Sequence, residues 1–282
     1  MAQGGTMDLI EFLQDLSIKG VKLRTDEGKL RTGGSQELLT TDVITKLEQY
    51  KSEILELLRE NSDIFQVYPL SYSQKYLWFL WQLSPQRHNY NVSFSVRIYS
   101  LVDITIWQQV FQALRERHPL LRSTFPKLGQ QPIQQLHQHQ DLDFLQIDAS
   151  SWSEEELNKK VVAAHRYPFN LETEPVMRVR WFTCSEQDHI MLLTIHHIAL
   201  DGWSCNLVAK ELPQLYQAQL NGIEASLPPL QYSYQDYVSW QRELIEGEEG
   251  EQLWNYWQQK LSRELPVLNL PTDRPRPPIQ TY

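Results

Sequence analysis

Apolar and polar residues alternate in two different ways along the chain. In the first 60 residues, helical spacing predicts a helix over residues 9–16 and a helical apolar stripe over residues 43–58. Between them, "GVKLRTDEGKLRT" (20–32) alternates apolar and basic residues around an Asp-Glu-Gly turn, which predicts a β-hairpin. The opening part of the chain is therefore expected to be a small helical unit that carries one hairpin.

From residue 68 onward, the pattern predicts alternating helices and strands. Helices are expected for "YPLSYSQKYLWFLWQL" (68–83), "TIWQQVFQALRERHP" (105–119) and "SCNLVAKELPQLYQAQL" (204–220), the last one interrupted at Pro213, which would open a second segment. Strands are expected for "YNVSFSVRIYS" (90–100), "RVRWFTC" (178–184) and "HIMLLTI" (189–195). This order predicts an α/β sandwich, followed by an extended proline-rich strap at 270–282.

Composition and charge exclude several classes of protein. A hydrophobic fraction of 41% indicates a globular chain, and a net charge of −9 argues against nucleic acid as the main partner. No apolar run reaches the roughly 18–20 residues of a membrane span, and no signal-peptide pattern opens the chain. Cys184 and Cys205 form no disulfide framework, so reduced thiols in the cytoplasm are expected. "MAQGGT" (1–6), ahead of Met7, is expected to be an expression remnant.

The stretch "MLLTIHHIALDGWS" (191–204) carries the strongest candidate chemistry. Adjacent histidines on a strand point to opposite faces, so we expect one of His196 and His197 to enter a cavity while the other is packed. Three interpretations stay open at this point. One histidine with Asp201 makes a poor metal site, because the ligand count is too low. Both rings could instead be buried in the core, or His197 could act as a general base near neutral pH.

Asp201 constrains the general-base interpretation. A carboxylate in contact with the imidazole would favour its protonated form, which cannot accept a proton. If Asp201 instead faces away, it can pair with an arginine from "RERHPLLRSTF" (115–125), and Gly202 would supply the turn that reverses the chain. A second histidine cluster in "LHQHQD" (136–141) could bind a metal, but a solvated surface run fits this polar stretch better.

The predicted hairpin is basic, although the helices around it are acidic. Five basic residues stand against two acidic ones between residues 19 and 31. An open, basic strand edge could bind an acidic peptide by strand addition. The alternative is that the lysines only protect an exposed edge from aggregation.

The residues H-H-x-x-x-D-G at 196–202 resemble the signature of nonribosomal peptide synthetase condensation domains and related acyltransferases. Three further stretches follow the family's order and resemble its motifs: "LSYSQKYLWFL" (70–80), "RHPLLRSTF" (117–125) and "YSYQDYVSWQ" (232–241). Tyr76 stands where the first motif has arginine, and Pro119 stands where the second has glutamate. Residues 7–60 are similar to the N-terminal docking domain of the tubulysin-synthetase type.

The resemblance implies a domain order and a set of site residues. It implies a docking domain at 7–60, a linker at 61–67 and, at 68–282, the first of two chloramphenicol-acetyltransferase-like lobes, which would be inactive without the second. His197 would be the catalytic histidine and His196 would support the strand, while Asp201 would form a salt bridge with Arg117. Gly202 would leave room at the substrate tunnel. Motif residues that complete this set are Arg122, Trp203 and Ser204.

The implied reaction joins two substrates that are tethered to peptidyl carrier proteins. The amine of an aminoacyl thioester would attack an acyl or peptidyl thioester, both delivered on phosphopantetheine, with no cofactor or metal bound permanently. The docking domain, which could itself be homodimeric, would bind the C-terminal peptide of the upstream subunit through Lys19, Val21, Lys22, Leu23, Arg24, Lys29 and Arg31. Two alternatives remain: a coenzyme A-dependent acyltransferase of small molecules, and a non-catalytic docking fragment.

Overall fold

The computed structural model of the chain describes residues 9, 12–13, 15–16, 19, 21–26, 29–33, 38–59, 66–137, 141–266, 270–271 and 273–275. The expected expression remnant, most of the expected linker and most of the proline-rich strap lie outside these residues. Contacts divide the chain into one unit from Met1 to Val238 and a second from Ser239 to Tyr282. No helix within the described ranges combines the length and apolar character that crossing a membrane requires.

The first 60 residues contain the predicted hairpin and helices. Strand β1 (Lys22–Asp26) pairs with β2 (Lys29–Gly33) in antiparallel register, with Asp26 opposite Lys29. Two helices follow, α2 (Thr41–Gln49) and α3 (Lys51–Arg59), and the Thr40 side chain caps α2 by accepting from the Val43 amide. The core of this part contains Leu9, Phe12, Leu13, Leu16, Val21, Leu23, Leu47, Tyr50 and Ile54.

A four-stranded sheet forms the centre of the larger part of the chain. Its order is β4 (Asn91–Ile98), β10 (Asp188–His196), β9 (Met177–Ser185) and β8 (Asp143–Asp148). β10 pairs antiparallel with both β4 and β9, whereas β8 runs parallel to β9. Because β10 has a neighbour on each side and helices over both faces, all of its residues after Asp188 are buried.

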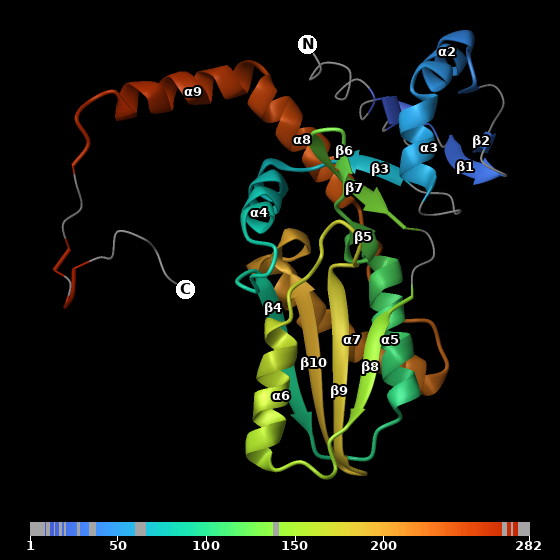
Figure 1. Cartoon of the computed structure of the whole chain (residues 1–282), viewed down its shortest axis with the longest axis vertical. Coiled ribbons are helices and arrows are strands. Elements are labelled where there is room, and N and C mark those ends of the chain that lie inside the picture. Colours follow the sequence, from blue (N-terminus) through green and yellow to red (C-terminus); the bar gives the residue numbers. More distant parts are fainter. Residues whose placement is uncertain are drawn as a thin grey trace. The chain divides into compact units, whose positions relative to one another are not determined.

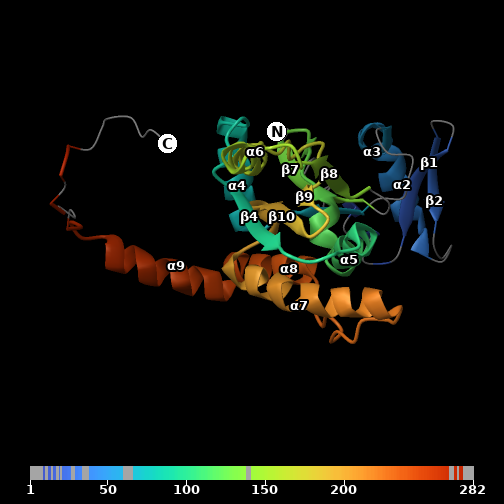
Figure 2. The same ribbon diagram turned by 90° about the horizontal axis from the view of Figure 1, so that it is seen from below.

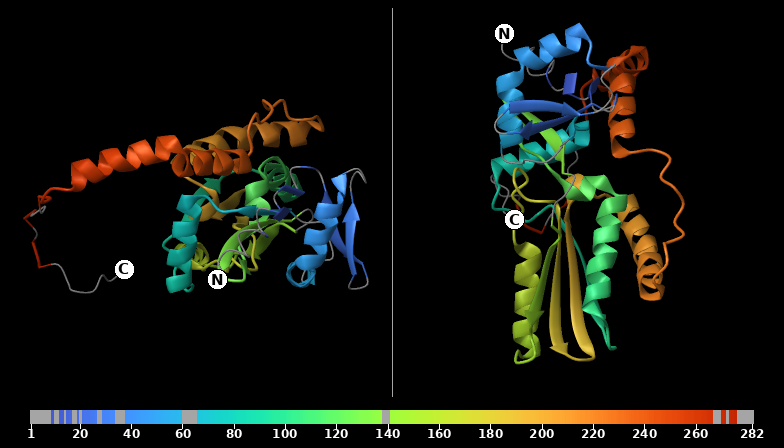
Figure 3. Two further views of the ribbon diagram at one scale, coloured as in Figure 1. Left: turned by 90° about the horizontal axis from the view of Figure 1, so that it is seen from above. Right: turned by 90° about the vertical axis from the view of Figure 1, so that its right-hand side faces the viewer.

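Helices cover both faces of this sheet, as Figures 1 and 2 show. On one face, α5 (Ile104–Arg117) and α7 (Gly202–Asn221) pack against β9 and β10 around residues such as Trp181 and Leu193. On the other face, α6 (Glu154–Arg166) covers a smaller cluster. Figure 3 shows the sheet between these two layers. This arrangement confirms the predicted α/β sandwich.

A second, smaller sheet lies in the same part of the chain, in the order β3 (Gln66–Pro69), β7 (Gln131–Leu136) and β5 (Ser123–Thr124), and β6 (Lys127–Leu128) also pairs with β7. Helix α4 (Tyr72–Leu83) begins with a capping box at Ser71, and the short 3₁₀ helix η2 (Pro119–Arg122) follows α5. Pro119 ends the predicted helix as expected, because α5 stops at Arg117.

The predicted interruption at Pro213 is wrong, because α7 continues through this proline. Proline lacks the N–H that would bond one turn back, which weakens a helix interior. Packing compensates, since Val208, Leu215 and Ala218 of α7 are all buried and α7 lies along α5. Tertiary burial therefore outweighs the local preference at this position.

Helix α8 (Tyr234–Glu246) crosses the boundary between the two units, and α9 (Glu248–Leu261) belongs to the second unit. Three acidic residues in the first turn of α9 suit the positive end of its dipole. No α9 side chain is buried, and several of its large apolar residues are exposed: Leu253, Trp254, Tyr256, Trp257 and Leu261.

Candidate active site

The two histidines at the end of β10 lie in different environments. β10 ends at His196, and a short 3₁₀ helix, η3 (His197–Ala199), follows it. His196 is only 3% exposed, whereas the His197 side chain is exposed. The interpretation with both rings in the core is therefore wrong, and of the two only His197 offers its ring to a molecule in solution.

The buried imidazole of His196 shapes the backbone that follows it. Its Nδ1 accepts a hydrogen bond of 3.1 Å from the Ile198 amide, so the ring is in the tautomer protonated on Nε2. Burial, together with the charges of His197 and Arg178, lowers the pKa of His196 to about 3. The ring therefore stays neutral at physiological pH, and its Nδ1 remains available to accept from the Ile198 amide of η3.

Backbone hydrogen bonds hold the chain on both sides of His197. The His196 amide donates to the Val176 carbonyl at 2.9 Å, and the His197 amide donates to the Tyr90 carbonyl at 2.8 Å. The Tyr90 ring also lies 6.3 Å from the His196 ring. The exposed imidazole thus extends from a backbone in which the amides of His196, His197 and Ile198 are all hydrogen-bonded.

The predicted ion pair between Asp201 and Arg117 is wrong. Asp201 is the N-cap of α7, and its Oδ1 accepts from the Ser204 amide at 2.8 Å and from the Ser204 hydroxyl at 2.7 Å. These hydrogen bonds lower the pKa of Asp201. Gly202 is the first helical residue rather than a turn residue, and a Cβ there would meet no atom within 4 Å. Helix capping accounts for the carboxylate, because the four first amides of a helix lack internal partners.

Asp201→Ala is expected to destabilise the chain by about 1 kcal/mol, because it removes this cap. Asp201→Asn should retain most of the stability, since asparagine caps helices as well as aspartate does. Thermal unfolding of both variants at pH 7 measures the difference. Equal losses for alanine and asparagine would show that the charge of Asp201, rather than its capping oxygen, stabilises the fold.

Arg117 pairs instead with Glu211, a buried carboxylate in the middle of α7. Arg117 Nε donates to Glu211 Oε1 at 2.9 Å, and His118 Nε2 lies 2.6 Å from Oε2 of the same carboxylate. The Glu211 side chain is 4% exposed. Arg117 Nη2 also donates to the Pro228 carbonyl at 2.6 Å. These contacts tie the end of α5 to α7, so Arg117 orients the helix that follows the histidine pair.

A pocket of about 560 Å³ lies beside the loop that carries His197. It is lined by the end of η3, the first turns of α7, η2 and the segment 230–236. Most of the large side chains facing it are apolar or aromatic: Leu120, Leu200, Leu207, Leu230, Tyr232 and Tyr234. Trp203, in the first turn of α7, is 84% exposed. An apolar recess is therefore placed two residues along the chain from the exposed imidazole.

Arg122 and the "LHQHQD" stretch take places that the sequence did not predict. Arg122 Nη1 donates to the His137 carbonyl at 2.9 Å. His137 is 9% exposed, and burial near Arg115 and Arg122 lowers its pKa to about 4. The interpretation as a solvated surface run is therefore wrong for His137, while His139 lies outside the described residues. Among those residues, no group of three or more potential ligands could hold a metal ion.

The hairpin divides its residues between the core and the surface. Val21 and Leu23 were predicted to contact the partner, but the two residues are only 5% and 6% exposed. Their side chains pack in the core between the hairpin and the helices of this part of the chain, so that prediction is wrong for side-chain contacts. Lys29 and Arg31 on β2 are exposed, and Arg31 Nε lies 3.6 Å from Asp26 Oδ2. Lys22 and Arg24 lie on strand β1. Lys19 pairs with Asp15 at 2.6 Å, also at the surface.

Sequence reasoning missed two residues that shape the site. Glu211 falls between Val208 and Leu215 on the buried side of α7, where a lone carboxylate should have indicated a buried partner. Arg178, 2% exposed, was hidden because "RVRWFTC" is typical of a strand with one solvated face. α6 occupies that face of the sheet, and its N-cap Ser153 with three following glutamates was a readable helix start.

Comparison with known proteins found two family models that match this chain. Residues 64–282 match the family model "Condensation domain", and residues 9–60 match the model "TubC N-terminal docking domain". The chain is 32% identical to one of the linear gramicidin synthase proteins of Brevibacillus parabrevis, over 96% of this chain and 4% of that protein. It is 30% identical to bacitracin synthase 2 of Bacillus licheniformis, over 98% of this chain and 11% of that protein.

Solved structures show the same fold. The X-domain from teicoplanin biosynthesis superposes with a TM-score of 0.64 at 26% identity, covering 74% of this chain and 46% of that one. The first condensation domain of the calcium-dependent antibiotic synthetase gives a TM-score of 0.60 at 20% identity, over 71% of this chain and 49% of that one. The chain thus spans about half the length of these solved domains and a small part of the curated synthetases.

Proposed function

Because the chain belongs to the condensation-domain family of nonribosomal peptide synthetases and begins with a docking domain, we propose that it contributes His197 to amide bond formation between two carrier-bound substrates. The amine of a downstream aminoacyl thioester attacks the carbonyl carbon of an upstream acyl or peptidyl thioester. The C–N bond forms, the C–S bond breaks, and the upstream carrier leaves as its thiolate.

The observation that carries this proposal is the contrast between the two rings. His197 presents an exposed imidazole on a fixed backbone, while the Nδ1 of His196 is occupied by the Ile198 amide. We assign to His197 the acceptance of the amine proton during attack and its return to the leaving thiolate. Proton transfer of this kind typically contributes 10²–10⁴-fold to a rate. Phosphopantetheine takes part here as the arm of the carrier-bound substrates.

The pocket beside η3 supports a second contribution, which is placement of a substrate. Its lining is mostly apolar, and it opens next to the segment that bears His197. Holding two tethered reactants in an attacking geometry can be worth more than the proton transfer itself. We assign this recess to an apolar portion of one tethered substrate.

The reaction is tested by loading the upstream carrier with an acyl group and the downstream carrier with an amino acid, in the intact synthetase. Intact-protein mass spectrometry should show the acyl mass moving onto the downstream carrier. Blocking the acceptor amine by N-acetylation should stop the transfer. Transfer from acyl-coenzyme A to a free small amine, without carriers, would support the alternative acyltransferase activity instead.

We assign the hairpin to binding an acidic C-terminal peptide of the upstream subunit. Among the described residues, β1 and β2 pair only with each other, which leaves each strand an outer edge to which an extended peptide can add. Lys29 and Arg31 lie exposed on β2, and attraction between opposite charges would orient the peptide. We also propose that the docking domain forms a homodimer.

The double variant Lys29→Glu/Arg31→Glu is expected to bind that peptide about tenfold more weakly, a loss of roughly 1.4 kcal/mol. Charge repulsion replaces attraction, so the loss should shrink as salt is raised. Isothermal titration calorimetry measures the affinity. The control Lys159→Glu/Lys210→Glu makes the same charge change at exposed sites on α6 and α7, outside the hairpin and its helices. Equal weakening by both doubles would attribute the effect to net charge and remove the hairpin as the site.

A further inference from the structure

A buried arginine is connected to the histidine pair through one aromatic ring. The guanidinium carbon of Arg178 lies 3.7 Å from the centre of the Phe169 ring. The same ring meets His196 edge-on, with centroids 5.9 Å apart and an interplanar angle of 83°. Arg178 is 2% exposed, Phe169 2% and His196 3%. The three side chains therefore form one buried stack that ends at the imidazole.

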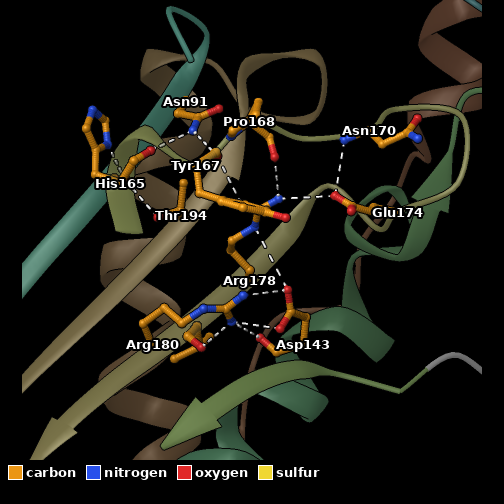
Figure 4. A network of polar contacts seen from close by, with 12 residues as sticks. Asn91, Asp143, His165, Tyr167, Pro168, Asn170, Glu174, Arg178, Arg180 and Thr194 are labelled. Atoms are coloured by element: carbon orange, nitrogen blue, oxygen red, sulfur yellow. Dashed lines mark hydrogen bonds and ion pairs between the residues drawn. The ribbon is translucent and has the colours of Figure 1, made fainter. Parts of the chain in front are cut away.

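Arg178 holds the segment that carries Phe169, as Figure 4 shows. Its Nη1 donates to the Tyr167 carbonyl at 3.0 Å, and its Nη2 donates to the Pro168 carbonyl at 3.1 Å and to Glu174 Oε2 at 3.3 Å. Glu174 Oε2 also accepts from the Asn170 amide at 3.1 Å. A planar guanidinium with several donors can bind two carbonyls and stack on a ring at once, which an ammonium group cannot do.

The stack of Arg178, Phe169 and His196 affects the hydrogen bonding of the backbone next to His197. His196 can accept from the Ile198 amide only while its Nδ1 is unprotonated. The segment that Arg178 anchors covers the His196 ring through Phe169. The positive charge of Arg178 also disfavours a second positive charge on the His196 ring. If the ring became protonated, the Ile198 amide would lose its acceptor, and the backbone that bears the exposed His197 imidazole would be held less firmly.

We propose that Arg178 is a positioning residue for His197: by anchoring residues 167–174 and stacking on Phe169, it keeps His196 neutral and thereby fixes the turn from which His197 extends. This role rests on the proposed function of His197. Arg178 touches no substrate in this account, and its effect passes through Phe169 and His196.

Charged and titratable groups approach this stack from several elements. Arg178 comes from β9, Glu174 and Tyr167 from the segment before β9, Asp143 from β8, His197 from η3, and Tyr90, whose ring lies beside His196, from the residue before β4. Arg178 Nε lies 3.9 Å from Asp143 Oδ2, but the same carboxylate is shared with Arg180, whose Nη1 lies 2.7 Å from Oδ1. Arg180 therefore has a similar charge environment, and its hydrogen bonds go to Asp143 and Val179 rather than to the 167–174 segment.

The first test follows the protonation state of His196 by NMR of selectively labelled imidazoles in this chain. In the wild type, His196 should remain neutral and protonated on Nε2 from pH 8 down to pH 5. In Arg178→Met, loss of the nearby charge and of the cover over the ring should raise the pKa of His196 by at least three units, to about 6, so that protonation of the ring becomes visible within this pH range. The matched control Arg180→Met should leave it unchanged. An unaltered tautomer and pKa in Arg178→Met would overturn the proposal.

The second test compares acyl transfer at several pH values in the intact synthetase. The ratio of kcat for Arg178→Met to kcat for the wild type should fall at least twofold between pH 8 and pH 6, because a His196 ring with a pKa of about 6 is half protonated at pH 6, while the ratio for Arg180→Met stays flat. Arg178→Lys, which retains the charge but loses the paired carbonyl contacts, should recover part of the difference. A ratio that is constant with pH would reduce Arg178 to a purely structural role and contradict the proposal.

A milder variant covers the case in which Arg178→Met fails to fold, as judged by circular dichroism. Phe169→Leu leaves the Arg178 hydrogen bonds in place and removes only the ring between Arg178 and His196, so it should shift the pKa of His196 upward by a smaller amount. No shift there would also overturn the proposal. If even the wild type transferred no acyl group, the proposed function would fail, but the NMR result would still decide whether Arg178 controls His196.

Discussion

Replacing His197 by alanine is expected to lower the rate of acyl transfer between loaded carriers about 10²–10⁴-fold in the intact synthetase. The exposed ring would no longer accept the proton of the attacking amine, while binding and placement of the tethered substrates would persist. Single-turnover rates by mass spectrometry of the downstream carrier measure the loss. Since the His197 side chain is exposed, the melting temperature should stay near that of the wild type.

His196→Ala serves as the contrasting variant for this prediction. It removes a buried ring and leaves the Ile198 amide without its acceptor, so it should destabilise the fold. The two variants separate a chemical role from a structural role at neighbouring positions. An His197→Ala protein that transfers the acyl group at a near-normal rate would contradict the assignment of proton transfer to this residue.

Glu211→Ala is expected to cost about 3–5 kcal/mol of folding stability, the largest loss we expect from a single charged side chain in this chain. Removing the carboxylate leaves Arg117 and His118, both mostly buried, without their shared acceptor. With roughly 2–4 °C per kcal/mol for a chain of this size, the melting temperature should fall by about 10 °C. Thermal unfolding at pH 7 measures this change.

Glu116→Ala is the matched control, because Glu116 is an exposed glutamate on α5 whose side chain accepts from Gln112. Its removal should change stability by no more than about 0.5 kcal/mol. Similar melting temperatures for Glu211→Ala and Glu116→Ala would show that the Arg117–Glu211 pair contributes little, and would reopen the question of what holds the end of α5.

The parts of the fold that the sequence predicted are those in which local signals agree with burial. The apolar run before His196 is a central strand, and Pro119 lies just beyond the end of α5, as the sequence predicted. Pro213 shows the reverse case, since packing of α7 on α5 overrides a local helix breaker. Residue spacing is enough to predict a strand edge, a helix stripe or a motif. It does not show whether tertiary packing will outweigh the low helix propensity of a residue such as Pro213.

The sequence predicted the residues of the candidate site better than it predicted the contacts that these residues make. Sequence order places His197 beside Asp201, but which of several arginines meets which carboxylate depends on how α5 crosses α7. In the structure, Arg117 meets Glu211, and Asp201 caps the helix that it precedes. Arg178 was missed because its strand pattern is typical of one solvated face, and no local pattern indicates its partners, two backbone carbonyls about ten residues earlier along the chain.

Chemical rescue tests most directly whether the accessible imidazole performs the proton transfer. Acyl transfer is measured in His197→Gly and His196→Gly versions of the intact synthetase, with increasing concentrations of free imidazole. Restored transfer in His197→Gly, with none in His196→Gly, is the predicted result, because only the first substitution leaves a vacancy that solvent can reach. Failure of imidazole to raise the His197→Gly rate, together with rescue of His196→Gly, would contradict the account.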